Sequence, residues 1–481
     1  MDILLSHGYF ISEDTHEQKI MKPYPTLGLL YISSYLKSKN ISVEIYDSTF
    51  KNLADFENYI FSNKPQIVGL YCNLMTKFNI LKMIQICKKY GSKIILGGPE
   101  PPYYAEEYLK RGADVVVIGE GELTLEELIP YFQSKSDKTL SEFDGIAFLD
   151  ENGNLMKTKP RKQIENLSDL PWPDREAIDL NKYLQTWKQF HGESSTSIIT
   201  ARGCPYTCTW CSHSVFGESH RRRTVDDVAD EVEWIRKKYN PDQLWYADDV
   251  LTINKNWFLD YANELKKRKI RIPFECISRA DRLSEEIIDA LFEMGCNRLW
   301  IGAESGSQKI LDSMQRKTNT ADVQKKTKLL QEKGIQVGMF IMLGYEGEEI
   351  PDLKDTVNHL KKSNPDIFLT TVSYPIKGTK YYNEVEHKVV SNFEWDFMND
   401  RDYIVQGRYS RKFYNHVTRW MVNDVLLSQM IQKKSFDIYK MFKLFIHSLL
   451  GRIGMFLTRN QKEQIPSGRG WSAKERAEHA W

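Results

Sequence analysis

Three of the seven cysteines of this chain lie within the stretch "TARGCPYTCTWCSHSVFG". They are Cys204, Cys208 and Cys211, separated by three residues and then by two. Each iron of a four-iron cluster takes one outside ligand, usually a cysteine thiolate, so three cysteines leave one iron open. A metal needs such an open position to bind and activate a substrate. The spacing therefore indicates catalytic rather than purely structural metal chemistry.

A zinc site completed by His213 is the alternative interpretation of this loop. Structural zinc usually shows paired CxxC units, which this sequence lacks. A zinc-bearing nucleic-acid module is also expected to be basic. The 481 residues instead include 66 Lys and Arg against 65 Asp and Glu. The balanced charge predicts that nucleic acid is not a partner.

The segment "CPYTCTWC" resembles the CxxxCxΦC signature of the radical S-adenosylmethionine (SAM) superfamily, with Trp210 as the aromatic residue. The resemblance covers roughly residues 195–380. It implies that the three cysteines hold a [4Fe–4S] cluster and that SAM chelates the fourth iron. It also implies that an electron from the cluster cleaves SAM to methionine and a 5′-deoxyadenosyl radical.

The same resemblance implies further SAM-binding residues. Glu304, in "IGAESGS", would accept from ribose hydroxyls or from the SAM ammonium group, and Arg316 would pair with the SAM carboxylate. A structural hydrogen bond for Glu304, a helix-leading acidic turn for Asp248 and a solvated position for Arg316 stay open as alternatives. The expected SAM-binding residues are Trp210, Asp248, Glu304, Ser305, Arg316, Leu343 and Gly344.

Residues 195–382 show the element pattern that would position these groups. Apolar runs alternate with amphipathic helical stretches, which predicts six βα units, a partial (β/α)6 barrel of the TIM type. Chemistry in such barrels lies at the carboxyl ends of the strands, and the cysteine loop directly follows the first one. Strands are expected at 197–200, 243–248, 273–278, 298–305, 336–343 and 367–374, and helices at 225–239, 256–269, 284–294 and 351–363.

Three consecutive arginines, Arg221 to Arg223, follow the cysteine loop. We expect a solvated basic face, with an anionic substrate site as the alternative. Thr224, with Asp227 three residues later, predicts a capped helix start.

Residues 1–138 predict a doubly wound, Rossmann-like α/β domain. Near-continuous apolar strands separated by helices are typical of a parallel sheet covered on both faces. Ligands of such sheets bind at the carboxyl ends of the strands. The expected strands are 2–6, 42–47, 67–72, 93–98 and 113–119.

A doubly wound domain ahead of a radical SAM barrel resembles the cobalamin-binding subfamily, which includes class B-like methyltransferases and the anaerobic Mg-protoporphyrin monomethyl ester cyclase type. The stretches "PYPTLGLLYISSYL", "GGPEPP" and "DVVVIGEGE" carry this resemblance. It implies cobalamin contacts from Cys72, Asn73, Leu74, Gly97, Gly98, Gly119 and Glu120. At this position Cys72 is interpreted as a buried apolar thiol rather than a ligand of the cobalt.

Cobalt ligation by a protein histidine stays open. "DTHEQK" places Asp14 and His16 where related proteins carry Asp-x-His-x-x-Gly, but Lys19 replaces the glycine. A polar surface loop is the alternative interpretation.

The remaining segments connect or follow the two domains. Residues 139–194 combine a hairpin at 143–159 with an ordered inter-domain crossing. Residues 383–481 are mainly helical, aromatic and basic, and the tail after about residue 460 is expected to be poorly ordered. The apolar stretch 436–457 would contact a membrane surface, cap a greasy substrate, or pack over the barrel as a helix.

We therefore predict a cobalamin-dependent radical SAM enzyme that methylates an unactivated carbon of a small or lipid-like metabolite. SAM would serve as radical source and as methyl source. Cyclase or oxidative ring-forming chemistry, a radical SAM enzyme without cobalamin, and the zinc module remain rivals. A methylthiotransferase is disfavoured, because it would carry a second cysteine triad and only Cys72 and Cys87 precede the barrel.

The same interpretation predicts the partners of the protein and its location in the cell. The substrate would be hydrophobic or anionic, and a flavodoxin or ferredoxin would supply electrons. The N-terminus does not read as a signal peptide, and seven irregularly spaced cysteines favour a reducing cytoplasm, with contact at the inner face of the membrane as a variant.

Overall fold

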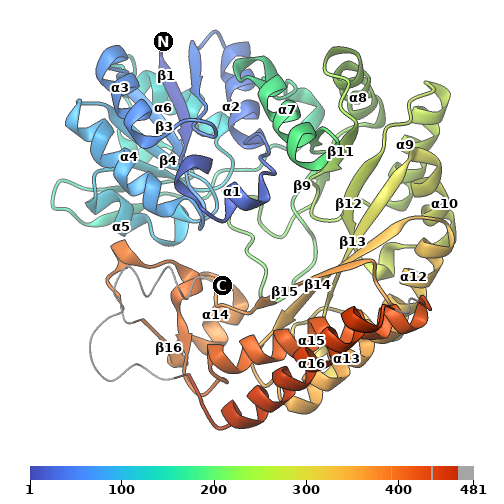
Figure 1. Cartoon of the computed structure of the whole chain (residues 1–481). Coiled ribbons are helices and arrows are strands. Elements are labelled where there is room, and N and C mark those ends of the chain that lie inside the picture. Colours follow the sequence, from blue (N-terminus) through green and yellow to red (C-terminus); the bar gives the residue numbers. More distant parts are fainter. Residues whose placement is uncertain (392, 435–436, 464–481) are drawn as a thin grey trace. The chain divides into compact units, whose positions relative to one another are not determined.

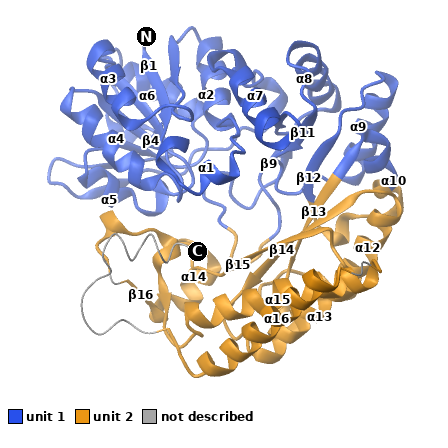
Figure 2. Ribbon diagram, viewed as in Figure 1, with its two compact units in different colours: residues 1–206, 212–277, 289–297 blue, residues 207–211, 278–288, 298–481 orange. Residues whose placement is uncertain are grey.

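The computed structural model describes residues 1–391, 393–434 and 437–463, which form two compact units (Figures 1 and 2). The first unit holds residues 1–206, 212–277 and 289–297, and the second holds residues 207–211, 278–288 and 298 onward. The predicted α/β architecture is confirmed. The predicted tail after about residue 460 lies mostly outside the described residues.

A seven-stranded sheet organises the N-terminal part of the first unit. Five parallel strands run in the order β2-β1-β3-β4-β5, the doubly wound arrangement, and the hairpin β6–β7 extends the same sheet antiparallel. The order reverses between β1 and β3, which is where such sheets bind ligands. The strands are β1 (Ile3–His7), β2 (Val43–Tyr46), β3 (Ile67–Tyr71), β4 (Lys93–Gly97), β5 (Val115–Val117), β6 (Ile146–Leu149) and β7 (Leu155–Lys157).

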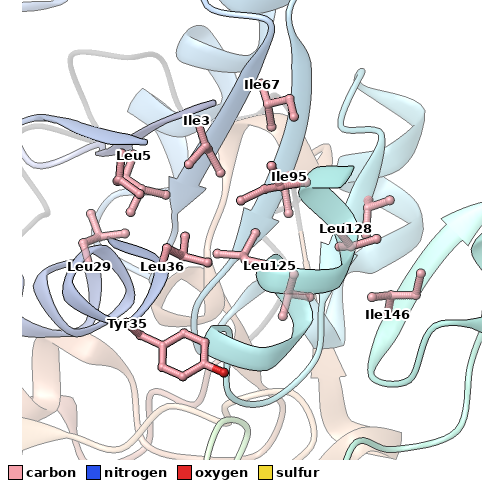
Figure 3. Packing of buried hydrophobic residues seen from close by; sticks show 14 of the residues in the cluster. Ile3, Leu5, Leu29, Tyr35, Leu36, Ile67, Ile95, Leu125, Leu128 and Ile146 are labelled. Atoms are coloured by element: carbon pink, nitrogen blue, oxygen red, sulfur yellow. The ribbon is translucent and has the colours of Figure 1, made fainter. Parts of the chain in front are cut away.

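Helices cover this sheet because its central strands bury apolar side chains on both faces. Ile3 and Leu5 of β1 point to one face, where α2 (Leu27–Ser38) and α6 (Glu122–Phe132) add Leu36, Leu125 and other apolar side chains (Figure 3). Leu4 alternates to the opposite face and is also buried. The remaining helices of this part are α1 (Glu17–Ile20), α3 (Leu53–Asn63), α4 (Lys77–Lys89), α5 (Ala105–Lys110) and α7 (Leu180–His191).

The six barrel strands predicted from the sequence are confirmed to within a few residues, and the second sheet has the order β15-β14-β13-β12-β11-β8. Its pairs are parallel for β8–β11–β12 in the first unit and for β13–β14–β15 in the second. The strands are β8 (Ser195–Ile198), β11 (Gln243–Tyr246), β12 (Phe274–Ser278), β13 (Cys296–Glu304), β14 (Gln336–Leu343) and β15 (Ile367–Val372). The helices are α8 (Val225–Lys238), α9 (Lys255–Lys267), α10 (Glu285–Met294), α11 (Gln308–Ser313), α12 (Thr320–Glu332) and α13 (Ile350–Ser363).

The expectation of a solvated arginine face at residues 221–223 is wrong. The chain folds back after the cysteine loop, so that β10 (Arg221–Arg222) pairs antiparallel with β9 (Ala201–Arg202). This pairing turns the three side chains inward, and each forms an ion pair with a buried or half-buried carboxylate. The predicted cap is confirmed, since the Thr224 side chain accepts from the Asp227 N–H at the start of α8.

The C-terminal region of the second unit is mainly helical, as predicted. Beyond α14 (Lys380–Val385) and the short strands β16 (Val389–Val390) and β17 (Ile404–Val405), two long helices form a hairpin, α15 (Arg411–Gln432) and α16 (Ile438–Thr458). Tyr381, Phe413 and Tyr414 are buried, so part of the aromatic density of this region is core. In the described chain, α16 is one helix whose length and composition would suffice to cross a membrane.

A buried arginine fixes the segment between the hairpin and the barrel. Arg175 is fully buried, and its Nη2 donates to the Ser197 carbonyl at 2.7 Å and to Glu231 Oε1 at 3.0 Å. It therefore ties the inter-domain segment to both β8 and α8. A buried pair of this kind is costly to break because the remaining charge is left without its partner.

We predict that Arg175→Ala lowers the free energy of unfolding by about 3–5 kcal/mol. The midpoint of the first urea transition, followed by circular dichroism, measures it. Lys89→Ala is the matched control, because its ion pair with Glu57 is exposed and should contribute little. Equal effects of the two substitutions would contradict the assignment of Arg175 as an anchor.

Candidate active site

The centre of the cysteine loop is held by hydrogen bonds within the second unit. The Thr209 N–H donates to the Met314 carbonyl at 3.1 Å, and the Thr209 carbonyl accepts from the Tyr381 N–H at 2.8 Å. The Thr209 and Tyr345 hydroxyls share a hydrogen bond of 2.6 Å. Three separate elements thus fix the residue between Cys208 and Trp210, which limits the motion of this part of the loop.

Two arginines lie beside the buried Cys208 sulfur. Arg316 Nη1 is 3.8 Å from Cys208 Sγ, and Arg279 Nη1 is 4.0 Å from it. Arg279 also donates to the Arg316 carbonyl at 2.8 Å, so the two side chains are positioned together. Arg316 was expected in the site from the sequence. Arg279 was not predicted to lie in the site. The only sequence signal for it is its position directly after the apolar strand β12.

Glu304 ends β13 in a strained backbone conformation. Its φ of 59° lies in the left-handed region, and the pairing with β14 shifts register between Gly302 and Glu304. A side chain on Gly302 would collide with the groups beside it, since an added Cβ would lie 2.5 Å from Glu304 Oε1. Non-glycine residues held in this region cluster at functional sites.

The electrostatics of Glu304 are also unusual. Its carboxylate is buried, with Oε1 3.8 Å from Arg316 Nε. Burial raises the pKa of Glu304 to about 7, against the opposing influence of Arg316 and Arg279. A buried acid that titrates near neutrality at a strand end is a candidate for ligand contact.

Buried hydrogen-bond donors without a partner near the cysteine loop indicate whether its residues suit an iron–sulfur cluster and SAM. In the part of the second unit that the structure describes, Trp210 Nε1 and Arg316 Nε are buried without a hydrogen-bond partner. Native proteins rarely leave such donors unsatisfied, so they point to an acceptor supplied by a ligand. A cluster held by thiolates is anionic, and the two guanidinium groups complement that charge. The residues present therefore fit both groups.

Within the described residues, no group of three or more His, Cys, Asp and Glu side chains is arranged to hold a single metal ion. A cubane differs from such a site, because each thiolate binds a separate iron.

Three predicted SAM contacts shape the strand ends. The Ser305 hydroxyl lies 3.2 Å from the Thr356 hydroxyl and accepts from the Ser307 N–H, and Leu343 is fully buried. Gly344 has a φ of 73°, and an added Cβ would lie 2.8 Å from the Tyr414 ring. Their roles in binding SAM stay predictions.

The turn after β14, Tyr345 to Glu348, closes on itself. Its Glu348 N–H donates to the Tyr345 carbonyl, and Glu348 Oε2 accepts from the Gly344 N–H at 2.5 Å. Gly347, at a φ of 78°, permits the turn.

Asp248, in the first unit, positions the start of the cysteine loop. Its carboxylate accepts from the Thr200 N–H at 2.7 Å, from the Thr200 hydroxyl, and from the Ala201 N–H at 3.3 Å. Arg222 Nη1 lies 3.5 Å away. Because both carboxylate oxygens are engaged, the geometry favours a positioning role, and a direct SAM contact stays a prediction.

Two glutamates after β5 and two arginines around the cysteine loop form a buried group that we call the carboxylate clamp, made of Glu120, Glu122, Arg202 and Arg221. Arg202 donates to Glu120 and to Glu122, each at 2.6 Å, and Arg221 donates to Glu120 at 2.7 Å. Glu120 also accepts from the Ile164 N–H at 3.0 Å. Burial opposes the charge on Arg202, but the two glutamates outweigh it and raise its pKa.

The clamp links the end of β5 to the two short strands that enter and leave the cysteine loop. Glu120 was expected to contact cobalamin; its carboxylate is engaged in the clamp, and the cobalamin contact stays a prediction.

At the carboxyl edge of the first sheet, two backbone segments lie so close together that only glycine fits between them. Gly98 has a φ of 116°, and an added Cβ would lie 2.2 Å from the Cys72 carbonyl oxygen, so no side chain fits. The Cys72 N–H donates to the Gly97 carbonyl at 2.8 Å, and the Asn73 side chain accepts from the Met75 and Thr76 N–H groups. Gly119, with a φ of 92°, provides a similar freedom after β5.

The same edge has an apolar surface at the end of β3. Leu74 is half-buried, while Met75 and Phe78 are exposed. Large exposed apolar side chains beside tight glycine turns fit a flat macrocycle. The residues present therefore suit a corrin ring at this edge.

Cys72 itself is a buried thiol. Its sulfur lies 3.2 Å from the Tyr108 hydroxyl, and burial raises its pKa. This favours the apolar-thiol interpretation over a cobalt ligand. His16 lies in an exposed turn whose N–H groups are held by Asp14, and its ligation of cobalt stays untested.

Comparison with protein families assigns both domains. Residues 198–360 match the radical SAM superfamily, and residues 18–129 match the B12 binding domain. The chain is a radical SAM protein with a B12-binding domain. Its cofactors are accordingly SAM, a [4Fe–4S] cluster and cobalamin, and it is an enzyme.

This radical SAM protein is similar along most of its length to an uncharacterized methyltransferase of Pyrococcus horikoshii, with 26% identity over 90% of this chain and 92% of that one. It is 27% identical to the anaerobic magnesium-protoporphyrin IX monomethyl ester cyclase of Rubrivivax gelatinosus, over 80% of this chain and 71% of the cyclase. Among solved structures it resembles the radical SAM methyltransferase TsrM of Kitasatospora setae, bound to cobalamin and a [4Fe–4S] cluster. That match has a TM-score of 0.68 at 17% identity, over 82% of this chain and 81% of TsrM, and supports the fold.

We predict that Glu120→Ala destabilises the first unit by about 3–5 kcal/mol and lowers the iron retained after reconstitution, because Arg221 then loses its buried partner. Glu127→Ala, in the helix α6 that follows Glu120, has a more exposed ion pair and is the control. Unfolding and iron content are measured on both variants. Unchanged iron content and stability in Glu120→Ala would refute the positioning role of the clamp.

We also predict a pH-dependent effect of the buried Glu348. Burial raises the pKa of Glu348 from about 4.5 to about 8, so the folded protein keeps a proton that the unfolded chain releases. The resulting stability is present below about pH 4.5 and is lost as pH rises through about 8. Relative to Glu348→Gln, the wild-type protein should lose about 5 kcal/mol between these limits.

Thermal unfolding across this pH range measures the effect, with Glu346→Gln in the same turn as the control. A constant difference between wild type and Glu348→Gln at all pH values would show that the carboxyl does not titrate as described.

Proposed function

We propose that this protein is a cobalamin-dependent methyltransferase that methylates an unactivated carbon of a small or lipid-like molecule. The observation that carries the proposal is the presence of both domains in one chain that aligns along most of its length with a methyltransferase. The resemblance to TsrM supports the fold.

In this proposal the second unit contributes Cys208, Cys211 and the charges around them. Cys204, Cys208 and Cys211 would hold the cluster, while Arg279 and Arg316 balance its charge at the Cys208 sulfur. When bound, the cluster and SAM supply a hydrogen-abstracting radical, and methylated cobalamin supplies the methyl group.

Trp210 and Glu304 would orient SAM. The indole N–H of Trp210 is available to an acceptor, and Glu304 can accept from hydroxyls or pair with an ammonium group. Because its pKa lies near 7, Glu304 can also hold a proton at neutral pH. Leu343 and Gly344 would provide an apolar strand end against which the adenine of SAM packs.

The carboxyl edge of the first sheet would hold the corrin. Gly97, Gly98 and Gly119 allow the ring to approach the backbone, and Leu74 gives apolar contact. Cys72 and Asn73 would shape this edge through their backbone hydrogen bonds.

Radical ring formation is the second candidate reaction. The observation that favours it is the similarity to the magnesium-protoporphyrin cyclase over 80% of this chain. The two reactions differ in their products, since a methyltransferase moves a labelled methyl group from SAM to substrate and a cyclase does not.

The substrate class and surroundings follow from the same proposal. A hydrophobic or anionic metabolite would be the substrate, and a low-potential flavodoxin or ferredoxin would reduce the cluster. The cytoplasm would supply both the reducing conditions and the donor.

We predict that Cys208→Ala abolishes formation of 5′-deoxyadenosine from SAM after anaerobic reconstitution with iron, sulfide and hydroxocobalamin. Cys87→Ala is the matched control, because Cys87 is a buried thiol outside the loop. The assay combines product chromatography with the visible spectrum of the desalted protein. A Cys208→Ala protein that forms 5′-deoxyadenosine at the wild-type rate would refute the cluster assignment.

The corrin arm of the experiment is independent of the cluster arm. Retention of about one corrin per chain in both variants is expected, because the first sheet is untouched. With [methyl-³H]SAM and candidate substrates, label appearing in the product supports methyl transfer, and a ring-closed unlabelled product supports the cyclase reaction.

A further inference from the structure

The outer face of α16 is a continuous exposed apolar surface. Its large apolar side chains are between 42% and 79% exposed. Single exposed apolar residues are common on protein surfaces, but a contiguous patch of this kind indicates an interaction surface. At 100° per residue they fall within an arc of about 140° on one side of the helix. The residues are Ile438, Tyr439, Phe442, Phe445, Leu449, Leu450, Ile453, Phe456 and Leu457, which we call the α16 apolar face.

The opposite side of α16 packs against α15 through small residues. An added Cβ on Gly451 would lie 2.6 Å from the Trp420 nitrogen, and one on Gly454 would lie 2.3 Å from the His416 ring. The Ser448 hydroxyl donates to Asp424 at 2.9 Å, and Arg452 donates to the same carboxylate at 3.1 Å. These contacts hold α16 against the protein along much of its length, so lipid cannot surround it as it would a spanning helix.

The charges beside the apolar face are basic. Residues 411–463 contain ten Lys and Arg against three Asp and Glu, and α16 itself contains no acidic residue. Two of the three acidic residues are engaged, Asp424 with Lys361 and Arg452, and Glu463 with Arg408. Lys443 lies at one border of the apolar arc, while Arg452 and Arg459 lie at the other, and all three are exposed.

From this arrangement we propose that the α16 apolar face docks in the plane of a membrane whose surface is anionic. Aromatic and aliphatic side chains would enter the boundary between headgroups and acyl chains, as amphipathic interfacial helices do. Lys443 and Arg459 would extend their charged ends to lipid phosphates while their apolar stems lie along the helix, and Arg452 stays paired with Asp424. The absence of carboxylates on α16 favours an anionic lipid surface over a basic protein partner.

The experiment is co-sedimentation of the full-length holoenzyme with sucrose-loaded vesicles. One set contains phosphatidylcholine with 30% phosphatidylglycerol, and the other contains phosphatidylcholine alone. We expect binding to the anionic vesicles that weakens at least fivefold when salt is raised from about 0.1 to 0.5 M, because the basic border is screened. Phe442→Gln/Phe456→Gln should weaken binding at least tenfold, since two exposed rings no longer enter the lipid.

Matched variants separate the effects of charge and general hydrophobicity. Lys443→Glu/Arg459→Glu, at the two borders of the apolar arc, should lose binding to anionic vesicles while leaving the packing against α15 intact. Phe190→Gln/Phe292→Gln removes two similarly exposed rings from α7 and α10 and should bind like the wild type. The circular dichroism spectrum should be unchanged in every variant, which shows that each is folded and keeps this test independent of the proposed function.

Three outcomes would overturn the proposal. Wild-type protein that stays in the supernatant with both vesicle types shows that another occupant covers this face. Equal binding by wild type and Phe442→Gln/Phe456→Gln shows that the face does not enter lipid. A wild-type dimer that binds no vesicles, and that Phe442→Gln/Phe456→Gln converts to a monomer, assigns the face to a second copy of the chain.

Discussion

The buried carboxylate clamp is the interaction on which the first unit depends. Glu120 and Glu122 leave the end of β5, while Arg202 and Arg221 stand at the entry and exit of the cysteine loop. Four charges removed from water are tolerable only when each has a close partner, and here every one has. Within the first unit, the clamp therefore ties the end of β5 to β9 and β10, the short strands that enter and leave the cysteine loop.

A second polar contact continues this arrangement. Asp248 holds the backbone at Thr200 and Ala201, at the start of β9, so the chain reaches Cys204 from a fixed point. Further along, Thr209 is fixed by backbone and hydroxyl contacts in the second unit. The reactive loop is thus anchored before and within its cysteines, as chemistry at a cluster requires of loops placed at strand ends.

The sequence allowed the strands, their order of succession and the cysteine motif to be predicted, because apolar runs and short-range spacing are local properties. The partners of charged residues could not be predicted in the same way. The sequence predicted a solvated face for Arg221 to Arg223, yet each of them forms an ion pair with a carboxylate in the interior. Glu120 likewise pairs with Arg202, which lies 82 positions away in the sequence. Arg279 was missed for the same reason, since its closeness to Cys208 arises only when β12 and the loop are both folded. Local pattern fixes which residues form a strand, whereas tertiary contact fixes which charges are buried.

The left-handed backbone at Glu304 has a consequence for how this enzyme would respond to selection. Glycine would occupy that conformation without steric cost, so the strand end would become more stable if the carboxylate were lost. If Glu304 binds SAM as proposed, stability and ligand binding therefore pull in opposite directions at this position. A library screened only for resistance to heat would enrich substitutions that relax β13 and discard the acid, and the resulting proteins would be sturdier and less able to hold a ligand there.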